Sequence, residues 1–268
     1  MFEDGLTPVQ HFEFYAKRED LACFHGEEMP SGAKVRQYLA MIAEAPADAV
    51  FAVGCSAASA MQIYVAALGV VMQRPAYIAV PRRKQRHPCT QWCADQGAHI
   101  IETVPGYPSV FRARIKQHID ALGLTSVPWS TRVAALDTAE QVANVPAQAR
   151  RIVVPNGSGL TAAGIVGGLW QWKMQHIEVH LVSTHDSVGT RPQVLKLVAK
   201  HFGDDAVDGA RISWRAQTMP YQRAVCGVTL ADGTLLDPFY AAKAACYCGA
   251  EDVLWITGRR PMASYWQA

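Results

Sequence analysis

This chain of 268 residues lacks several features that would assign it to a broad class. It has no uninterrupted apolar run approaching the ~20 residues that span a bilayer, so we expect no membrane association. Its first residues, MFEDGLTPVQHFEF, are mixed and acidic and do not form an apolar signal segment, which favours a cytoplasmic location. Its formal net charge of +2 is too small to indicate a general affinity for nucleic acid.

The cysteines follow neither a disulfide nor a zinc pattern. There are seven, an odd number, and no two of them form the C-x-x-C pair typical of zinc ligands. In a chain without a signal segment this spacing predicts reduced thiols, buried or half-buried, and no bound metal.

What the sequence does contain is an alternation of short apolar runs with helical patterns. Strands are expected at residues 49–54, 74–81, 99–104, 150–159, 177–184 and 252–260, and helices over residues 31–42, 57–72, 87–98, 160–175, 191–203 and 240–250. Such alternation predicts an α/β fold with mainly parallel sheets covered on both faces. The poorly periodic stretch 121–148 is interpreted as a return crossing between two lobes, and Asp232-Gly233 as the turn of a hairpin.

A glycine-rich turn follows the strand expected at residues 150–159. In VVPNGSGLTAAG, Gly157 and Gly159 let the backbone approach an anion closely, and Ser158 and Thr161 add hydroxyl donors. The helix that starts at Leu160 points its first N–H groups at the same place, which suits a phosphate. The turn is neither a Walker A loop nor a G-x-G-x-x-G fingerprint, and a purely structural tight turn is the alternative.

A lysine in the first turn of a predicted helix is the second unusual feature. The segment SGAKVRQYLAMI starts a helix near Ser31, so Lys34 lies beside the positive end of the helix dipole, where a cation is disfavoured. A solvated surface lysine is one interpretation. The other is a lysine with a lowered pKa, whose free amine attacks a carbonyl.

A second glycine turn, VGCSAASAMQ, favours the chemical interpretation. Its residues Gly54, Cys55, Ser56 and Ser59 lie between a buried strand and a helix, at the edge where open parallel sheets bind ligands. A phosphate site, small hydroxyls and a reactive lysine suit a phosphorylated aldehyde that is held by the lysine as a Schiff base.

Four motifs of the chain match a known family in that family's order. YAKREDL followed by SGAKVRQYLAMI, then VPNGSGLTAAGIVGG, LLDPFYAAKA and WITGRR resemble motifs of the tryptophan-synthase-β-like, fold type II pyridoxal-phosphate (PLP) enzymes. The branch that they resemble most is the aminocyclopropane-carboxylate deaminase and D-cysteine desulfhydrase family. The resemblance spans residues 15–260 and implies a two-lobed α/β fold with pyridoxal 5'-phosphate between the lobes.

The resemblance implies a role for each matching residue. Lys34 matches the lysine that carries the cofactor and then acts as general base, and Tyr240 matches the tyrosine beside the reacting carbon. Thr257 matches the hydroxyl that faces the pyridine nitrogen. The cofactor phosphate is expected on the backbone of the loop Gly157, Ser158, Gly159, Leu160 and Thr161.

The chain departs from the family pattern around the pyridine ring. Where the family places an asparagine against the ring oxygen, this chain offers Ser56 or Ser59, depending on the direction from which positions are counted. Ala241 stands where the deaminase branch has a glutamate that protonates the ring nitrogen. The family's T-G-G is T-G-R-R here.

The resemblance also divides the chain into lobes. We expect a large PLP-binding lobe of residues 1–45 and 146–268, a small lobe of residues 46–145, and a homodimer.

The expected reaction takes place at the α-carbon of a small amino-acid substrate. A hydroxyl and an alanine opposite the ring nitrogen make the cofactor a weaker electron sink, which favours deamination or β-elimination, because a leaving group then takes the electrons. The alternative is decarboxylation, or a related step, on an amino-acid adduct of a larger anionic substrate such as a hypermodified, phage-type DNA base. That substrate would lie near Arg82, Arg83, Lys84 and Arg86. A catalytically inactive PLP-fold scaffold is the third interpretation.

Overall fold

The computed structural model describes residues 5–22, 29–183, 191–215 and 223–260, which form two compact units. The described residues within 1–22, 31–37 and 130–259 make up the first unit, and those within 23–30, 38–129 and 260–268 make up the second. These boundaries differ from the expected lobes, because residues 38–45 belong to the second unit and residues 130–145 to the first.

The first unit is built on a six-stranded sheet. Its strand order is β1-β2-β10-β7-β8-β9, and every neighbouring pair except β1–β2 is parallel. The strands are β1 (Val9–His11), β2 (Tyr15–Arg18), β10 (Asp252–Ile256), β7 (Arg151–Asn156), β8 (Glu178–Ser183) and β9 (Ile212–Arg215). The sequence predicted β7, β8 and β10, whose near-continuous apolar runs are typical of strands that are buried on both faces.

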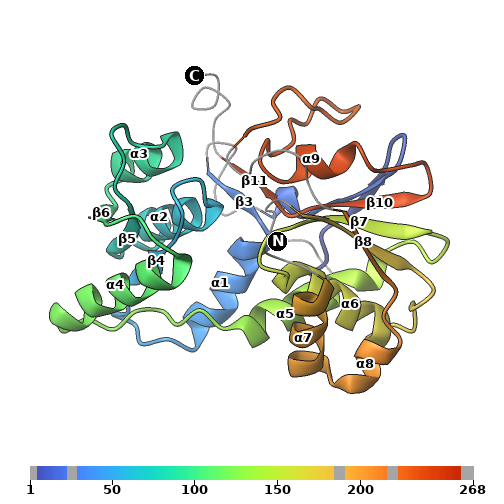
Figure 1. Ribbon diagram of the computed structural model, residues 1–268, viewed down its shortest axis with the longest axis horizontal. Coiled ribbons are helices and arrows are strands. Elements are labelled where there is room, and N and C mark those ends of the chain that lie inside the picture. Colours follow the sequence, from blue (N-terminus) through green and yellow to red (C-terminus); the bar gives the residue numbers. More distant parts are fainter. Residues whose placement is uncertain (1–4, 23–28, 184–190, 216–222, 261–268) are drawn as a thin grey trace. The chain divides into compact units, whose positions relative to one another are not determined.

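Helices cover both faces of this sheet (Figure 1). One face carries α6 (Leu160–Gln171), α7 (Arg191–Phe202) and α8 (Asp204–Asp208), and the other carries α9 (Ala241–Ala245). Ile152 and Val154 of β7 belong to the first core, and Val153 belongs to the second. Successive strand residues therefore point into opposite layers, as the period of two requires, and the predicted two-faced parallel sheet is confirmed.

The stretch 121–148 contains a helix that the sequence did not predict. Helix α5 (Thr131–Glu140) and the 3-10 turn η2 (Gln141–Asn144) both pack against α6. The buried face of α5 consists of small residues, including Ala134, Ala135 and Ala139, so the helix shows little hydrophobic periodicity. The interpretation of this stretch as a return crossing is therefore incomplete.

Glycines on α6 let α5 and α6 approach closely. A Cβ atom at Gly164 would lie 2.6 Å from Cβ of Thr138, and a Cβ atom at Gly168 would lie 2.6 Å from the carbonyl oxygen of Ala139. Neither position has room for a side chain. The close contact fixes α6, and with it the loop that precedes α6.

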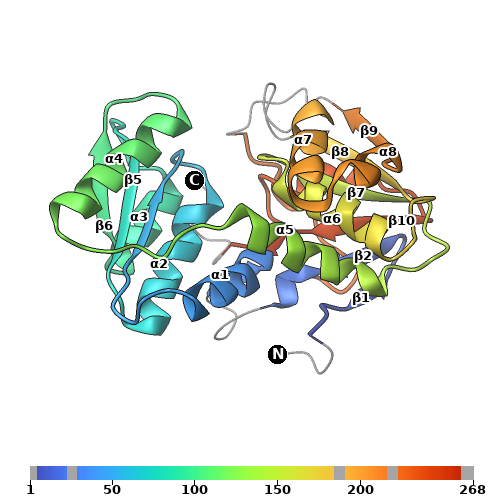
Figure 2. The ribbon, with the colours of Figure 1, turned by 90° about the horizontal axis from the view of Figure 1, so that it is seen from below.

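The second unit is a three-stranded parallel sheet with helices on both faces (Figure 2). Its strands, in spatial order, are β4 (Phe51–Gly54), β5 (Ala76–Pro81) and β6 (His99–Thr103). Helix α4 (Pro108–Ala121) packs on one face, and α2 (Ala60–Met72) and α3 (Pro88–Asp95) lie on the other. The sequence predicted each of these elements except α4. No described helix combines the length and apolarity that crossing a bilayer requires.

The described cysteines agree with the expected reduced state. All six are free thiols, and Cys55, Cys89 and Cys93 are buried. Cys248 is half-buried, but Cys226 and Cys246 are exposed, so the expectation of buried or half-buried thiols is wrong for these two. The Asp232-Gly233 turn is also present, since Leu230 N donates to Thr234 O at 2.9 Å and Thr229 bridges Leu235.

We expect Gly164→Ala and Gly168→Ala each to destabilise the protein by about 1–3 kcal/mol, because the added methyl group overpacks the contact between α5 and α6. Denaturant unfolding followed by circular dichroism measures the loss. Gly209→Ala is the matched control, since Gly209 has a φ of −81° and its Cβ would lie 3.5 Å from the nearest atom, Cγ of Gln175. Equal stability of the three variants would contradict the packing described for α6.

Candidate functional site

The carboxyl ends of β10, β7 and β8 lie at one edge of the six-stranded sheet, where open parallel sheets bind ligands. Strand β7 ends at Asn156, and its register partner is Ser183, the last residue of β8. Strand β10 ends at Ile256, so Thr257 leaves the sheet at the same edge as Gly157. Two of the predicted site elements therefore follow adjacent strands.

The loop between β7 and α6 has the backbone geometry of an anion site. Gly159 has a φ of +85°, in the left-handed region that favours glycine, and it caps the start of α6. Ala163 N donates to Gly159 O at 2.9 Å. In any α-helix the N–H groups of the first turn point out of the helix end, so those of Leu160 and Thr161 point toward the loop. The positive end of the helix dipole adds to their attraction for an anion.

A short antiparallel strand pair carries Lys34 to this edge. Strand β11 (Gly258–Arg259) follows Thr257 and pairs with β3 (Ser31–Gly32), with Gly258 opposite Gly32. Helix α1 (Ala33–Ala43) starts directly after β3, and Ala33 N donates to Thr257 O at 3.3 Å. Lys34 is the next residue. The structure thus brings the predicted lysine and the predicted threonine together.

The surroundings of Lys34 favour its neutral amine. The residue is half-buried, and burial lowers the pKa of its side chain from 10.5 to about 8. This shift raises the fraction of free amine near neutral pH by roughly two orders of magnitude. The electrostatics therefore favour the chemical interpretation of Lys34 over that of a solvated surface charge.

Tyr240 directly precedes α9, which packs on the face of the sheet opposite α6. Tyr247, beyond the other end of α9, lies at the amino edge of the sheet, because its carbonyl accepts a hydrogen bond of 2.8 Å from Nη2 of Arg151, the first residue of β7. Helix α9 therefore runs antiparallel to β7 and begins toward the carboxyl edge. The buried carboxylate of Asp237 fixes the turn, since Oδ1 accepts from Tyr240 N at 3.0 Å.

Ser56 and Ser59 belong to the second unit, in the turn between β4 and α2. Ser59 is the N-cap of α2, and its Oγ accepts a hydrogen bond of 3.2 Å from Met61 N. Ser59 N in turn donates to Ser56 O at 3.0 Å. Ser59 is therefore engaged in capping its own helix, and the contact of either serine with a pyridine ring stays a prediction.

Arg260, which sequence reasoning missed, contacts this turn. Its buried guanidinium donates through Nη1 to Ala58 O at 3.0 Å and to Cys89 Sγ at 2.9 Å. The contact ties the end of the T-G-R-R motif to the turn that carries Ser56 and Ser59. The difference between T-G-R-R here and the family's T-G-G was the feature of the sequence that could have indicated a role for Arg260.

The basic loop after β5 is a surface loop. Arg82, Arg83, Lys84 and Arg86 are all exposed. Glu102 balances part of their charge, because Arg82 and Arg86 place Nε atoms 4.0 and 3.1 Å from its carboxylate oxygens.

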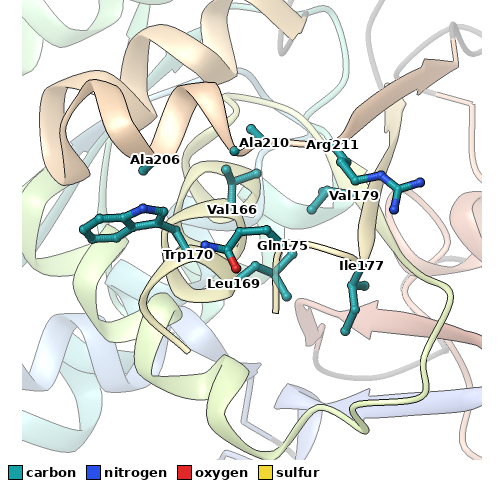
Figure 3. A pocket seen from close by; sticks show the side chains of 10 residues that line it. Val166, Leu169, Trp170, Gln175, Ile177, Val179, Ala206, Ala210 and Arg211 are labelled. Carbon is teal, nitrogen blue, oxygen red and sulfur yellow. The ribbon is translucent and has the colours of Figure 1, made fainter. Parts of the chain in front are cut away.

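A small cavity between α6, α8 and the start of β8 is separate from this site (Figure 3). Its lining is mainly apolar and includes Leu169, Trp170 and Ile177. Its volume is about 10 Å³, which is room for about one water molecule. The cavity is too small for an organic cofactor.

Solved structures share this architecture, although no protein-family model and no curated protein matches the sequence. An ACC deaminase homologue superposes with a TM-score of 0.74 at 17% identity, over 94% of this chain and 89% of the homologue. A fungal L-serine ammonia-lyase from Rhizomucor miehei gives a TM-score of 0.65 at 16% identity, over 97% of each chain. A pyridoxal 5'-phosphate-dependent aspartate racemase gives 0.58 at 12% identity, over 94% of this chain and 89% of the racemase.

The chain has the fold of the type II PLP enzymes. The predicted fold class is therefore confirmed, and with it the α/β architecture with mainly parallel sheets.

For this fold type II protein we expect the amine of Lys34 to become reactive with a midpoint near pH 8 when no cofactor is added, because burial disfavours its protonated form. Competitive labelling with a small amine reagent across pH, resolved by peptide mass spectrometry, measures the midpoint. The exposed Lys84 and Lys173 serve as internal references. A midpoint for Lys34 equal to those of the two references would show that its amine is an ordinary solvated one.

Proposed function

We propose that this protein is a PLP-dependent enzyme that acts on the α-carbon of a small amino acid, by deamination or β-elimination. One observation carries the proposal. The β3–β11 pair and the parallel register bring Lys34, Thr257 and the loop 157–161 to one edge of a sheet. The deaminase homologue and the ammonia-lyase that share the fold support the same class of reaction.

The residues at this edge fit PLP. The loop 157–161 offers N–H groups and the hydroxyls of Ser158 and Thr161 to a phosphate, and left-handed Gly159 lets the backbone approach it. Lys34 offers an amine with a lowered pKa to an aldehyde. Thr257, beside Lys34, offers a neutral hydroxyl to the pyridine nitrogen.

Each of these residues has a defined part in the reaction. Bound PLP would supply an electron sink for the electrons released at the α-carbon. Lys34 would hold the cofactor through its amine and would accept the α-proton of the substrate as general base. Tyr240 would hold or move a proton on the far side of the ring. Ser56 or Ser59 would contact the ring where the family has an asparagine.

The choice of elimination rests on the two residues that the family resemblance assigns to the side of the pyridine nitrogen, because neither of them carries a carboxylate. Thr257 offers a hydroxyl there, and Ala241, next to Tyr240, is fully buried and carries no charge. Without a carboxylate the ring nitrogen would stay largely unprotonated, which weakens the electron sink. A leaving group that takes up the electrons then favours β-elimination or deamination over routes through a long-lived carbanion.

The proposal also includes the cellular compartment and the oligomeric state of the enzyme. Free thiols at all six described cysteines support a reducing compartment, and hence the cytoplasm. A homodimer remains part of the proposal, and sedimentation of the purified protein tests it.

We expect the purified protein, supplied with PLP, to release ammonia and a keto acid from at least one small amino acid. Lys34→Ala should abolish both this activity and the visible absorbance of bound cofactor, because it removes the amine that would bond to the aldehyde of the cofactor. A screen of D- and L-amino acids with a coupled keto-acid assay measures turnover, with Lys173→Ala as the control. Bound PLP without turnover of any free amino acid would favour a larger anionic substrate instead.

Tyr240→Phe separates cofactor binding from proton transfer. We expect it to preserve the absorbance of bound PLP and to lower kcat by about 10²–10⁴-fold, the scale of a general acid–base group. Tyr247→Phe is the matched control, because Tyr247 lies beyond the other end of α9, at the amino edge of the sheet. Full activity of Tyr240→Phe would remove Tyr240 from the mechanism.

A further inference from the structure

The first turn of α1 presents an electrostatic problem. It carries two cationic side chains, Lys34 and Arg36, and no acidic residue. The N-terminus of a helix is the positive end of its dipole, so both cations are placed unfavourably with respect to α1 itself. The compensating negative charge has to come from other elements.

Arg36 receives that charge from two carboxylates. Its Nη1 atom lies 2.6 Å from Oε2 of Glu19, and its Nη2 atom lies 3.0 Å from Oδ2 of Asp137. Nε of Arg36 lies 3.3 Å from Oδ1 of Asp137, so the contact with Asp137 is bidentate. The planar fork of a guanidinium fixes orientation in such a pair as well as distance.

All three side chains of this ion triplet are removed from solvent. Their side-chain exposures are 16% for Arg36, 0% for Glu19 and 18% for Asp137. Among the described residues, Oε1 of Glu19 has no hydrogen-bond partner, so the carboxylate of Glu19 depends on Arg36. Burial acts to lower the pKa of Arg36, but Glu19 and Asp137 outweigh burial and raise it. Burial raises the pKa of Asp137 to about 6, although Arg36 opposes the rise.

The triplet joins the lysine-bearing turn to the framework of the phosphate loop. Glu19 lies in η1 (Glu19–Leu21), directly after β2, and Asp137 lies on α5. Helix α5 is the element against which Gly164 and Gly168 of α6 pack without space for a side chain. Arg36 and α6 therefore both contact α5: Arg36 through an ion pair, and α6 through close packing.

We propose that Arg36 is a positioning residue, which holds the first turn of α1 in the orientation that presents Lys34 to the edge carrying the loop 157–161. The proposal rests on the proposed function of Lys34. It also assigns a purpose to the acidic part of the YAKREDL motif, because Glu19 supplies one of the two carboxylates that fix Arg36.

The experiment measures Lys34 by two independent readouts. In protein treated with PLP and reduced with borohydride, peptide mass spectrometry gives the fraction of Lys34 bonded to the cofactor at each PLP concentration. In cofactor-free protein, competitive labelling gives the pH midpoint of Lys34 reactivity. Thermal unfolding of each variant reports its stability separately.

We expect Arg36→Gln to raise the PLP concentration for half-maximal capture by Lys34 by about 10–100-fold, because a misplaced reacting group loses proximity. Its labelling midpoint should rise from near 8 toward that of the exposed Lys173, since a loosened turn lets water reach the amine. Arg36→Lys keeps the positive charge but lacks the bidentate guanidinium, so both of its readouts should lie between those of the wild type and those of Arg36→Gln. Asp137→Asn should also raise the PLP concentration for half-maximal capture and the labelling midpoint, but by smaller amounts than Arg36→Gln. If Arg36→Gln does not fold, Asp137→Asn and Arg36→Lys together test the positioning role.

Arg151→Gln is the matched control. It breaks another Arg–Asp pair of the first unit, with Nη2 of Arg151 2.7 Å from Oδ2 of Asp252, but at the amino edge of the same sheet. It should lower the melting temperature and leave both Lys34 readouts at their wild-type values.

Two results would overturn the positioning role: wild-type capture and midpoint in the folded Arg36 and Asp137 variants, or equal effects from Arg151→Gln. If wild-type Lys34 captures no PLP, the proposed function fails, and the labelling midpoints alone still decide the role of Arg36.

Discussion

The candidate site of this protein depends on a backbone pairing between two very short strands. Strands β3 and β11 contribute two residues each, and their pairing places Gly32 opposite Gly258. Because α1 starts directly after β3, the pairing carries Lys34 to the carboxyl end of β10. The loop 157–161 needs a separate anchor, which the close packing of α6 on α5 provides. Two independent constraints thus act on one edge of the sheet.

The first turn of α1 carries two basic side chains in a place that disfavours positive charge, and each side chain is accommodated in a different way. Both Lys34 and Arg36 lie where the helix dipole and burial disfavour a positive charge. A guanidinium keeps its proton, so Arg36 is held by Glu19 and Asp137. An amine can lose its proton, and the pKa of Lys34 is lowered to about 8. The difference between the two side chains explains why one of them suits a structural role and the other a nucleophilic one.

The central strands of the six-stranded sheet, β10, β7 and β8, could be predicted from the sequence, as could most of the helices. The outer strands β1, β2 and β9 and the helices α4, α5 and α8 could not. Strands that are buried on both faces, such as β7, consist of continuous apolar runs that are visible in the sequence. Helix α5 leaves no such signal, because it packs small residues against the glycines of α6. The glycine-rich loop 157–161 and Lys34 were predicted as site residues from motif and position. Arg36 was not, because its partners Glu19 and Asp137 lie 17 and 101 residues away in the sequence.

The pairing of β3 with β11 also bears on how the protein is made. It joins residues that stand near the two ends of the 268-residue chain, with the second unit formed largely by the residues between them. On a ribosome, residues 38–129 emerge early and contain a complete three-stranded sheet, which is able to fold as a local unit. Lys34 emerges earlier still, yet β11, which pairs with the strand β3 just before Lys34, is synthesised after the whole of this segment. The amine of Lys34 therefore reaches its place at the edge of the sheet only after β11 has been synthesised and has paired with β3.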